Sequence, residues 1–134
     1  MIFSLTLPPT DNSLRIPIIN KKTRRPEIIK SEVYRDWEHF ATIQWSKFCT
    51  KNKMSRQEDK PTYERQHRYK VTIFMQSKRT DISNFTKAAK DWATDKLYTD
   101  DKWVDFHIQL PVLIDSDNPR IEIDLDPEII ENIQ

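Results

Sequence analysis

Apolar and polar residues alternate along four stretches of the chain, which is the pattern of half-buried β-strands. The clearest example is the N-terminal stretch, in which Phe3, Leu5 and Leu7 share one face before two prolines end it. Strands are therefore predicted at residues 2–7, 69–76, 102–110 and 120–125. A further apolar stretch, at 14–19, contains Pro17, which restricts it to the edge of a sheet because proline cannot donate a backbone hydrogen bond.

Two other stretches place apolar residues at helical spacing. The first, at about 31–49, begins with Ser31 as a suitable N-cap, and the second runs from about 83 to 95. The apolar stripe predicted for the first helix consists of Val33, Trp37, Phe40, Ala41 and Phe48. The buried side predicted for the second helix consists of Phe85, Ala88, Ala89 and Trp92. Both stripes are expected to face the core.

The order of these elements indicates the fold class. Strands and helices mix without strict alternation, which is typical of α+β proteins. We therefore expect a small single domain over residues 1–134, with a mixed β-sheet and two main helices packed on it. The polar stretch at 50–67 lacks periodicity and is expected to form a mobile loop. Asp126 and Pro127 are suited to begin a short helix within 126–134, and a tail is the alternative.

The composition excludes several classes of function. The chain contains no glycine, so it has neither a glycine-rich phosphate loop nor a dinucleotide-binding fingerprint, which need glycine where the backbone approaches phosphate. Cys49 is the only cysteine, and together with the three histidines it offers no spaced zinc motif. We find no pattern of a secretory signal at the N-terminus and no apolar run long enough to span a membrane. These features predict a soluble, intracellular (cytoplasmic) protein.

The net charge of +1 conceals a strong asymmetry along the chain. Residues 1–90 carry 19 Lys and Arg against 9 Asp and Glu, a net charge of +10. Residues 91–134 carry 3 against 12, a net charge of −9. Such segregation indicates a basic surface for a polyanion, with the carboxylates kept elsewhere. The alternative is a chance segregation that the fold removes by mixing the two halves in space.

Candidate catalytic residues gather around the second predicted helix. Asn84, Lys87 and Asp91 are spaced so that they line one face of this helix, and Asp81 lies just before it. An amide, an amine and two carboxylates would then lie within one short segment. This is the strongest concentration of candidate chemistry in the sequence.

An acidic pair, Asp100 and Asp101, lies between this helix and the strand predicted at 102–110. If that strand pairs beside the one that ends near Gln76, the acidic pair returns toward Asp81. Clustered carboxylates repel one another unless a cation neutralises them. Hard oxygen ligands suit Mg²⁺, which binds one or two carboxylates together with substrate phosphates. The pattern therefore predicts a Mg²⁺ site suited to phosphodiester hydrolysis.

Lys87 would stabilise negative charge on the phosphate in the transition state of such a reaction. Each part also has a plainer interpretation. An Asp-Asp pair on the surface is often only a turn, and Lys87 and Asp91, four residues apart, form an ordinary ion pair on many helices.

The order Arg-x-Asp-x-x-Asn-x-x-Lys-Ala-x-x-Asp, followed by Asp-Asp-x-x-Val, resembles the RusA family of Holliday-junction resolvases. The residues that carry this resemblance are Arg79, Asp81, Asn84, Lys87, Ala88, Asp91, Asp100, Asp101 and Val104. Near the N-terminus, Leu5 to Pro9 with Asn12 and Arg15 is similar to the opening strand and turn of that family. The resemblance implies a small α+β homodimer that cleaves four-way DNA junctions with Mg²⁺ in recombination and repair. Family members are commonly carried by phages and prophages.

The resemblance also assigns roles to individual residues. It implies that the catalytic residues are Asp81, Lys87 and Asp101, and that Asp81, Asp100 and Asp101 hold the metal. Ser83 stands where the family has another aspartate, which lowers the negative charge of the site by one. Supporting roles then fall to Ser83, Asn84 and Asp91, and Asp91 is a candidate to compensate for the missing carboxylate.

The basic residues of the first half are candidates for contacts with DNA phosphates. The predicted DNA-binding residues are Lys21, Lys22, Arg24 and Arg25 in a loop, and Lys78 and Arg79 beside the proposed site. Phosphate contacts position a protein without reading sequence, which suits selection of a branched shape. A solvated loop is the alternative for residues 21–25.

Three functional hypotheses follow from the sequence. The leading one is a Mg²⁺-dependent, structure-selective endonuclease. The second is a catalytically impaired protein of the same fold that binds junctions or single strands, because Ser83 replaces a carboxylate. The third is a protein-interaction module without nucleic acid, in which the basic and acidic halves pair.

Overall fold

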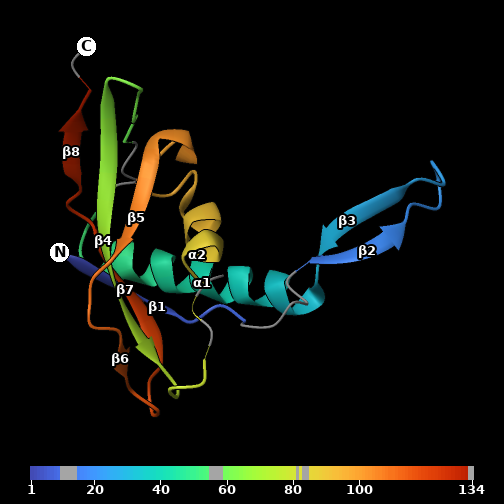
Figure 1. The fold of residues 1–134 in the computed structure, drawn as a ribbon, viewed down its shortest axis with the longest axis horizontal. Coiled ribbons are helices and arrows are strands. Elements are labelled where there is room, and N and C mark those ends of the chain that lie inside the picture. The colour runs from blue at the N-terminus through green and yellow to red at the C-terminus, as the bar shows by residue number, and fades with distance from the viewer. Residues whose placement is uncertain (10–14, 55–58, 81, 83–84, 133–134) are drawn as a thin grey trace.

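The computed structural model describes residues 1–9, 15–54, 59–80, 82 and 85–132, which form a main sheet with helices beside it and a separate two-stranded hairpin (Figure 1). The helices are α1 (Glu32–Lys51), α2 (Phe85–Ala93) and the short 3-10 helix η2 (Asp101–Trp103). The strands are β1 (Ile2–Thr6), β2 (Arg15–Ile19), β3 (Pro26–Lys30), β4 (Arg65–Met75), β5 (Val104–Ile108), β6 (Leu113–Ile114), β7 (Arg120–Asp124) and β8 (Glu128–Glu131). The fold is α+β with a mixed sheet and two main helices, as predicted.

The sheet is organised around β4, which is the longest of the strands described. β4 runs parallel to β5, with His67 opposite Val104, and antiparallel to β7, with Ile73 opposite Ile121. β1 pairs with the other edge of β7, while β6 and β8 pair with the two ends of β4. Alternate residues in the middle of β4 are buried, so one face of the sheet is apolar and the other is polar.

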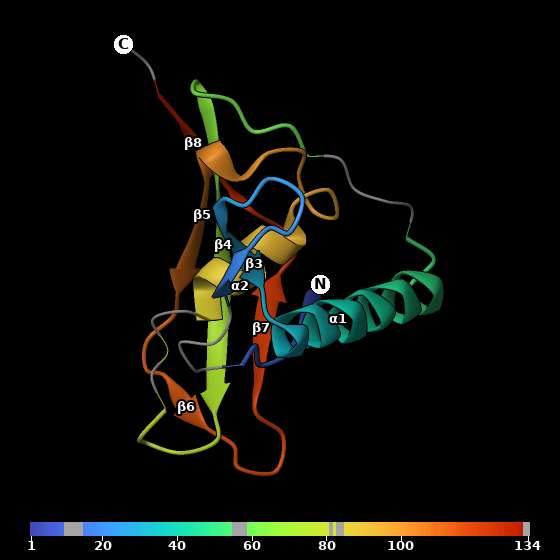
Figure 2. The same ribbon diagram turned by 90° about the vertical axis from the view of Figure 1, so that its right-hand side faces the viewer.

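Both main helices lie against the apolar face of this sheet (Figures 1 and 2). An aromatic cluster joins them to β1: the ring of Phe3 lies 5.0 Å from that of Trp45 in α1 and 5.8 Å from that of Trp92 in α2. The rings of Trp45 and Trp92 are 6.5 Å apart. Because all three rings contact one another, the cluster fixes the position of each helix relative to the sheet.

Helix α1 begins where the sequence predicts, since the side chain of Ser31 accepts a hydrogen bond of 3.2 Å from the backbone N–H of Tyr34. Its buried stripe is rotated from the predicted one. The buried residues are Tyr34, Trp37, Ala41 and Trp45, whereas Val33 and Phe40 are exposed. A stripe that recurs every three or four residues from Tyr34 leaves Val33 and Phe40 on the neighbouring face.

The C-terminal segment is a strand, so the predicted short helix or tail within 126–134 is wrong. β4 extends beyond β7 toward its own N-terminus and leaves a backbone edge free there. β8 pairs with that edge, placing Ile129 opposite His67 and Ile130 opposite Gln66. A strand satisfies the backbone groups of both segments, which a helix in this place would leave unpaired.

The polar connection between α1 and β4 is shorter than the loop predicted at 50–67. Thr50 and Lys51 belong to α1, and residues 65–67 belong to β4, so the connection covers 52–64. Within it, residues 55–58 lie outside the described part of the chain. The described remainder contacts the body of the protein, since the backbone of Asp59 bonds to that of Leu97 and Thr99.

The stretch predicted at 14–19 does not join the main sheet. β2 pairs with β3 as a separate antiparallel hairpin, with Pro17 opposite Ile28. The loop predicted at 21–25 is the turn of this hairpin. Figure 1 shows the hairpin projecting away from the sheet, beyond the N-terminal end of α1.

The central position of β4 predicts a large difference between two isoleucine substitutions. Ile73 is 0% exposed, so Ile73→Ala should lower the free energy of unfolding by about 2–5 kcal/mol. Ile19 is 71% exposed in the hairpin, so Ile19→Ala should change it by less than about 0.5 kcal/mol. Urea denaturation of both variants measures the difference, and equal effects would contradict the described core.

Candidate active site

The parallel pairing of β4 and β5 determines where the acidic pair lies. Because Val104 is opposite His67, residues just before β5 lie near the N-terminal end of β4. The carboxylate of Asp100 caps η2 by accepting a hydrogen bond of 2.9 Å from the backbone N–H of Lys102. Asp101 begins η2 and is half-buried. The acidic pair is therefore an ordered turn at one end of the sheet.

Two tyrosines stabilise the segment that leads into this turn. The hydroxyl of Tyr98 donates a hydrogen bond of 2.6 Å to the backbone carbonyl of Lys90 in α2. Burial, together with the nearby charge of Asp101, raises the pKa of Tyr98 well above its usual value. Burial and a bond to Asp59 likewise raise the pKa of Tyr69. Both hydroxyls therefore stay protonated and act as fixed donors.

Asp59 holds the same segment from the other side. Its backbone N–H donates to the carbonyl of Leu97 at 3.3 Å, and its carbonyl accepts from the N–H of Thr99 at 3.1 Å. Its side-chain Oδ2 accepts a hydrogen bond of 2.6 Å from the hydroxyl of Tyr69. Hydrogen bonds from the connection between α1 and β4 therefore hold the chain immediately before the acidic pair in position.

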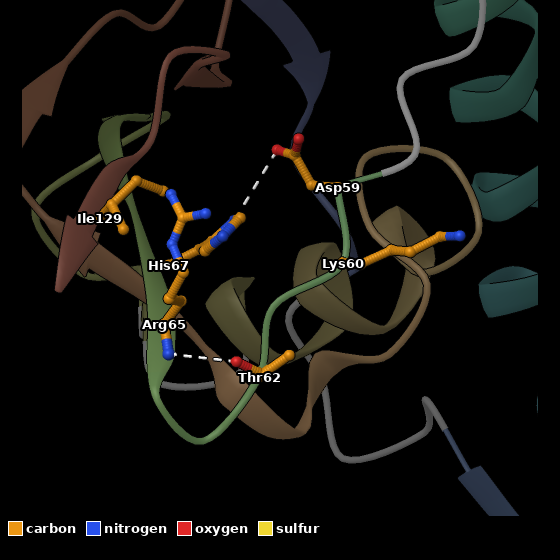
Figure 3. Close-up of a pocket in the computed structure, with 6 residues that line it drawn as sticks. All are labelled: Asp59, Lys60, Thr62, Arg65, His67 and Ile129. Atoms are coloured by element: carbon orange, nitrogen blue, oxygen red, sulfur yellow. Dashed lines mark hydrogen bonds and ion pairs between the residues drawn. The ribbon is translucent and has the colours of Figure 1, made fainter. Parts of the chain in front are cut away.

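A pocket of about 470 Å³ lies beside Asp59 (Figure 3). Its lining residues are Asp59, Lys60, Thr62, Arg65, His67 and Ile129. His67 is 8% exposed, and its Nδ1 lies 3.8 Å from Asp59 Oδ2, too far for a hydrogen bond. Burial lowers the pKa of His67, the charge of Asp59 opposes this shift, and the charge of Arg65 adds to it. The net effect favours a neutral imidazole.

A second pocket, of about 590 Å³, lies at the C-terminal end of β4. It is lined by the end of β1, the connection after β4 and one proline, namely Thr6, Leu7, Pro8, Pro9, Gln76, Ser77, Arg79, Thr80 and Pro119. α1 holds the end of β1, since Trp37 Nε1 donates a hydrogen bond of 2.8 Å to the carbonyl of Thr6. This pocket adjoins Thr80, the residue before Asp81.

The predicted site residues that the structure describes lie in three places: after the C-terminal end of β4, on α2 and just before β5. Asp81, Ser83 and Asn84 lie outside the described residues. Lys87 is exposed and Asp91 half-buried on α2. The described residues contain no group of three or more His, Cys, Asp or Glu side chains that could hold a metal ion.

The strand β5 pairs beside β4, but Asp81, toward which the acidic pair was expected to return, lies outside the described residues. The pairing is parallel, so the acidic pair lies near His67, while Thr80 lies beyond Met75. From His67 to Met75 the strand spans about 26 Å. Figure 1 shows η2 and the connection after β4 toward opposite ends of this strand.

The predicted DNA-binding residues of the first half are displayed at the tip of the hairpin. Lys21, Lys22, Arg24 and Arg25 are all exposed there. The side-chain oxygen of Asn20 orders the turn by accepting hydrogen bonds from the N–H groups of Lys22 (2.8 Å) and Thr23 (3.3 Å). Lys78 and Arg79 are exposed in the connection after β4. The basic groups therefore occupy two separate surfaces.

An α+β domain with an acidic turn and exposed basic surfaces has the features expected of a protein that acts on nucleic acid. Residues 17–126 match the protein-family model of endodeoxyribonuclease RusA. This match covers well over half of the 134 residues, and the chain belongs to the RusA family. RusA nucleases act on DNA junctions and generally depend on a divalent metal. No curated protein matched the chain, and none of the helices described is long and apolar enough to cross a membrane.

Sequence reasoning did not find the roles of Asp59 and His67. Asp59 is one polar residue in a polar stretch, and His67 precedes the strand predicted at 69–76. A weak signal for His67 was available, because it continues the alternation of Tyr69, Val71 and Ile73 toward the N-terminus. The position of Asp59 depends on long-range contacts that no local pattern contains.

The lowered pKa of His67 predicts an acid-sensitive contribution to stability. Its pKa in the folded protein lies below the unfolded value of 6.5. At pH values between these two pKa values, the unfolded chain therefore binds more protons than the folded protein. This contribution is complete above pH 6.5 and is lost as the pH falls toward the folded pKa. Melting temperatures between about pH 7.5 and 5.5 should therefore fall less in His67→Gln than in the wild type. His39→Gln, at an exposed position, is the control, and an equal pH dependence of the wild type and His67→Gln would contradict the assignment.

Proposed function

We propose that this protein is a Mg²⁺-dependent endonuclease that resolves four-way DNA junctions. The observation that carries the proposal is the family match over residues 17–126, a range that contains the acidic pair, Lys87 and most of the basic hairpin. Carboxylates are the donors that Mg²⁺ prefers, so the donor set of Asp81, Asp100 and Asp101 fits this ion. When bound, Mg²⁺ would polarise the scissile phosphate and lower the pKa of an attacking water.

The chain's own residues would perform the remaining tasks. Lys87 is exposed on α2 and would place its ammonium against the phosphate, stabilising the charge that grows in the transition state. Lys78 and Arg79 are exposed beside the pocket at the C-terminal end of β4 and would hold the DNA backbone. Asp59 would keep the acidic pair in position through its contacts with Leu97 and Thr99.

The position of Thr80, the residue before Asp81, at the other end of β4 from the acidic pair supports a homodimer with shared sites. The acidic pair lies near the N-terminal end of β4, and the residue before Asp81 lies beyond its C-terminal end. Mg²⁺–oxygen distances are only about 2.1 Å, so one ion cannot bridge the length of this strand. A second copy of the chain, related by two-fold symmetry, would bring Asp81 of one copy to the acidic pair of the other. Such a dimer also matches the near two-fold symmetry of a four-way junction.

Ser83 supports a second candidate function. The hydroxyl of serine is a neutral and weaker ligand for Mg²⁺ than the aspartate that the family has there. A chain whose site lacks one carboxylate ligand would bind junctions through its basic surfaces and cut them slowly. Asp81, Asn84, Lys87 and the acidic pair are all retained, which favours the active endonuclease.

Cleavage of a synthetic four-way junction tests the proposed activity. The wild type should cut the junction with Mg²⁺ and not with EDTA. Asp101→Asn removes one proposed ligand charge and should reduce cleavage by at least the roughly 10- to 100-fold that loss of an outer partner of a metal ligand costs. Asp117→Asn, at an exposed position in the turn before β7, is the matched control. Metal-independent cleavage, or equal activity of the two variants, would refute the metal assignment.

Lys87→Ala should separate catalysis from binding. Loss of one donor to the transition state should lower the cleavage rate by about 100- to 1,000-fold. Junction affinity should change little, because one ammonium is a small part of the basic surface. Lys47→Ala, which removes an exposed lysine from α1, is the control for a general charge effect. If binding and cleavage fall in parallel, Lys87 is a docking residue instead.

A further inference from the structure

The hairpin formed by β2, β3 and their turn, here called the basic arm (residues 15–30), has an exposed apolar face. The register of the two strands places Pro17 opposite Ile28 and Ile19 opposite Pro26, so these four side chains share one face. All four are exposed, Ile19 by 71% and Ile28 by 72%. Residues of this type are rarely displayed together on a projecting segment without a partner.

The opposite face and the base of the arm differ from this apolar face. Ile18 and Ile29 lie on the opposite face and are half-buried. At the base, the Lys30 ammonium forms an ion pair of 2.9 Å with Glu38 of α1 and lies 5.3 Å from the ring of Tyr34. The arm is thus attached to the body at one end, while the face with Ile19 and Ile28 remains uncovered.

An isolated two-stranded hairpin is marginally stable in water at best, so the arm gains stability when something covers it. The basic tip restricts what that partner can be. Lys21, Lys22, Arg24 and Arg25 lie within a few residues of the apolar face, and Glu27, the one acidic residue of the arm, is bound to Asn20 at 2.8 Å. The partner must therefore offer dense negative charge directly beside an apolar surface.

Junction DNA has this combination. A two-stranded ribbon fits the major groove of DNA, phosphates flank the groove, and base faces become accessible where stacking is interrupted at the branch point. Isoleucine and proline are among the side chains that proteins insert against unstacked bases. A second copy of the chain fits less well, because four side chains by themselves present far less than the roughly 1,200 Å² that a stable interface buries.

We infer that the apolar face of the basic arm packs against unstacked bases at the centre of a DNA junction, while the basic tip holds the adjoining phosphates. This inference rests on the proposed function, because it names the part of the substrate that the arm contacts. Continuous duplex offers phosphates but no open base faces. Ile19 and Ile28 therefore determine the preference for a junction over a duplex. The basic tip contributes equally to the affinity for both kinds of DNA.

The test measures binding without Mg²⁺, so that it does not depend on cleavage. The double variant Ile19→Ser/Ile28→Ser should lose about tenfold or more of its affinity for a four-way junction and keep its affinity for a duplex of the same length. A 2-aminopurine base at the branch point should brighten when the wild type binds and not when this variant binds. The conservative double variant Ile19→Leu/Ile28→Leu should retain both properties, which excludes a general loss of the hairpin.

A second double variant supplies the matched control for charge. Lys21→Gln/Lys22→Gln should weaken junction and duplex binding alike and reduce the salt dependence of both by about two counterions. An unchanged junction preference in Ile19→Ser/Ile28→Ser would overturn the inference. So would a change of its oligomeric state in light scattering, because the face would then be covered by a second copy. A wild type that binds the junction without cutting it would refute the proposed activity and leave this result interpretable.

Discussion

The parallel pairing of β4 with β5 is the constraint on which the rest of the structure depends. Two parallel neighbours require a crossover between them, and α2 provides it on the apolar face of the sheet. The crossover starts beyond Met75 and ends at the acidic pair near His67. The same pairing that buries Tyr69 and Val71 therefore places Thr80, the last described residue before Asp81, at the other end of β4 from the acidic pair.

The charge asymmetry of the sequence has two outcomes in the fold. Part of it is neutralised on the polar face of the sheet, where Arg68 of the first half lies 3.0 Å from Asp105 and 4.0 Å from Glu128 of the second half. The rest is displayed, because the tip of the basic arm projects away from the acidic turn (Figure 1). The fold therefore pairs some basic residues of the first half with acidic residues of the second half. The basic residues that remain exposed and unneutralised are the ones that a polyanion would contact.

Local patterns predicted most of the elements, and long-range pairing decided the rest. Alternation and capping identified β1, α1, β4, α2, β5 and β7. The hairpin partner of β2 and the strand β8 were missed, since each forms only because another segment offers a free backbone edge. The direction of the β4–β5 pair was predictable in principle, because a helix between two strands favours a parallel pair. The backbone hydrogen bonds of Asp59 could not be predicted, since nothing near it in the sequence specifies Leu97 and Thr99 as its partners.

Subunit complementation tests the shared site most directly. Asp81→Asn and Asp101→Asn chains, each inactive alone but able to bind a junction, are mixed and allowed to exchange subunits. In a mixed dimer one site loses both carboxylates, and the other combines Asp81 of one chain with Asp101 of its partner. If the site is shared between subunits, mixing restores Mg²⁺-dependent nicking of one junction strand. A mixture that exchanges subunits and binds the junction, yet never nicks it, would show that each site is built from a single chain.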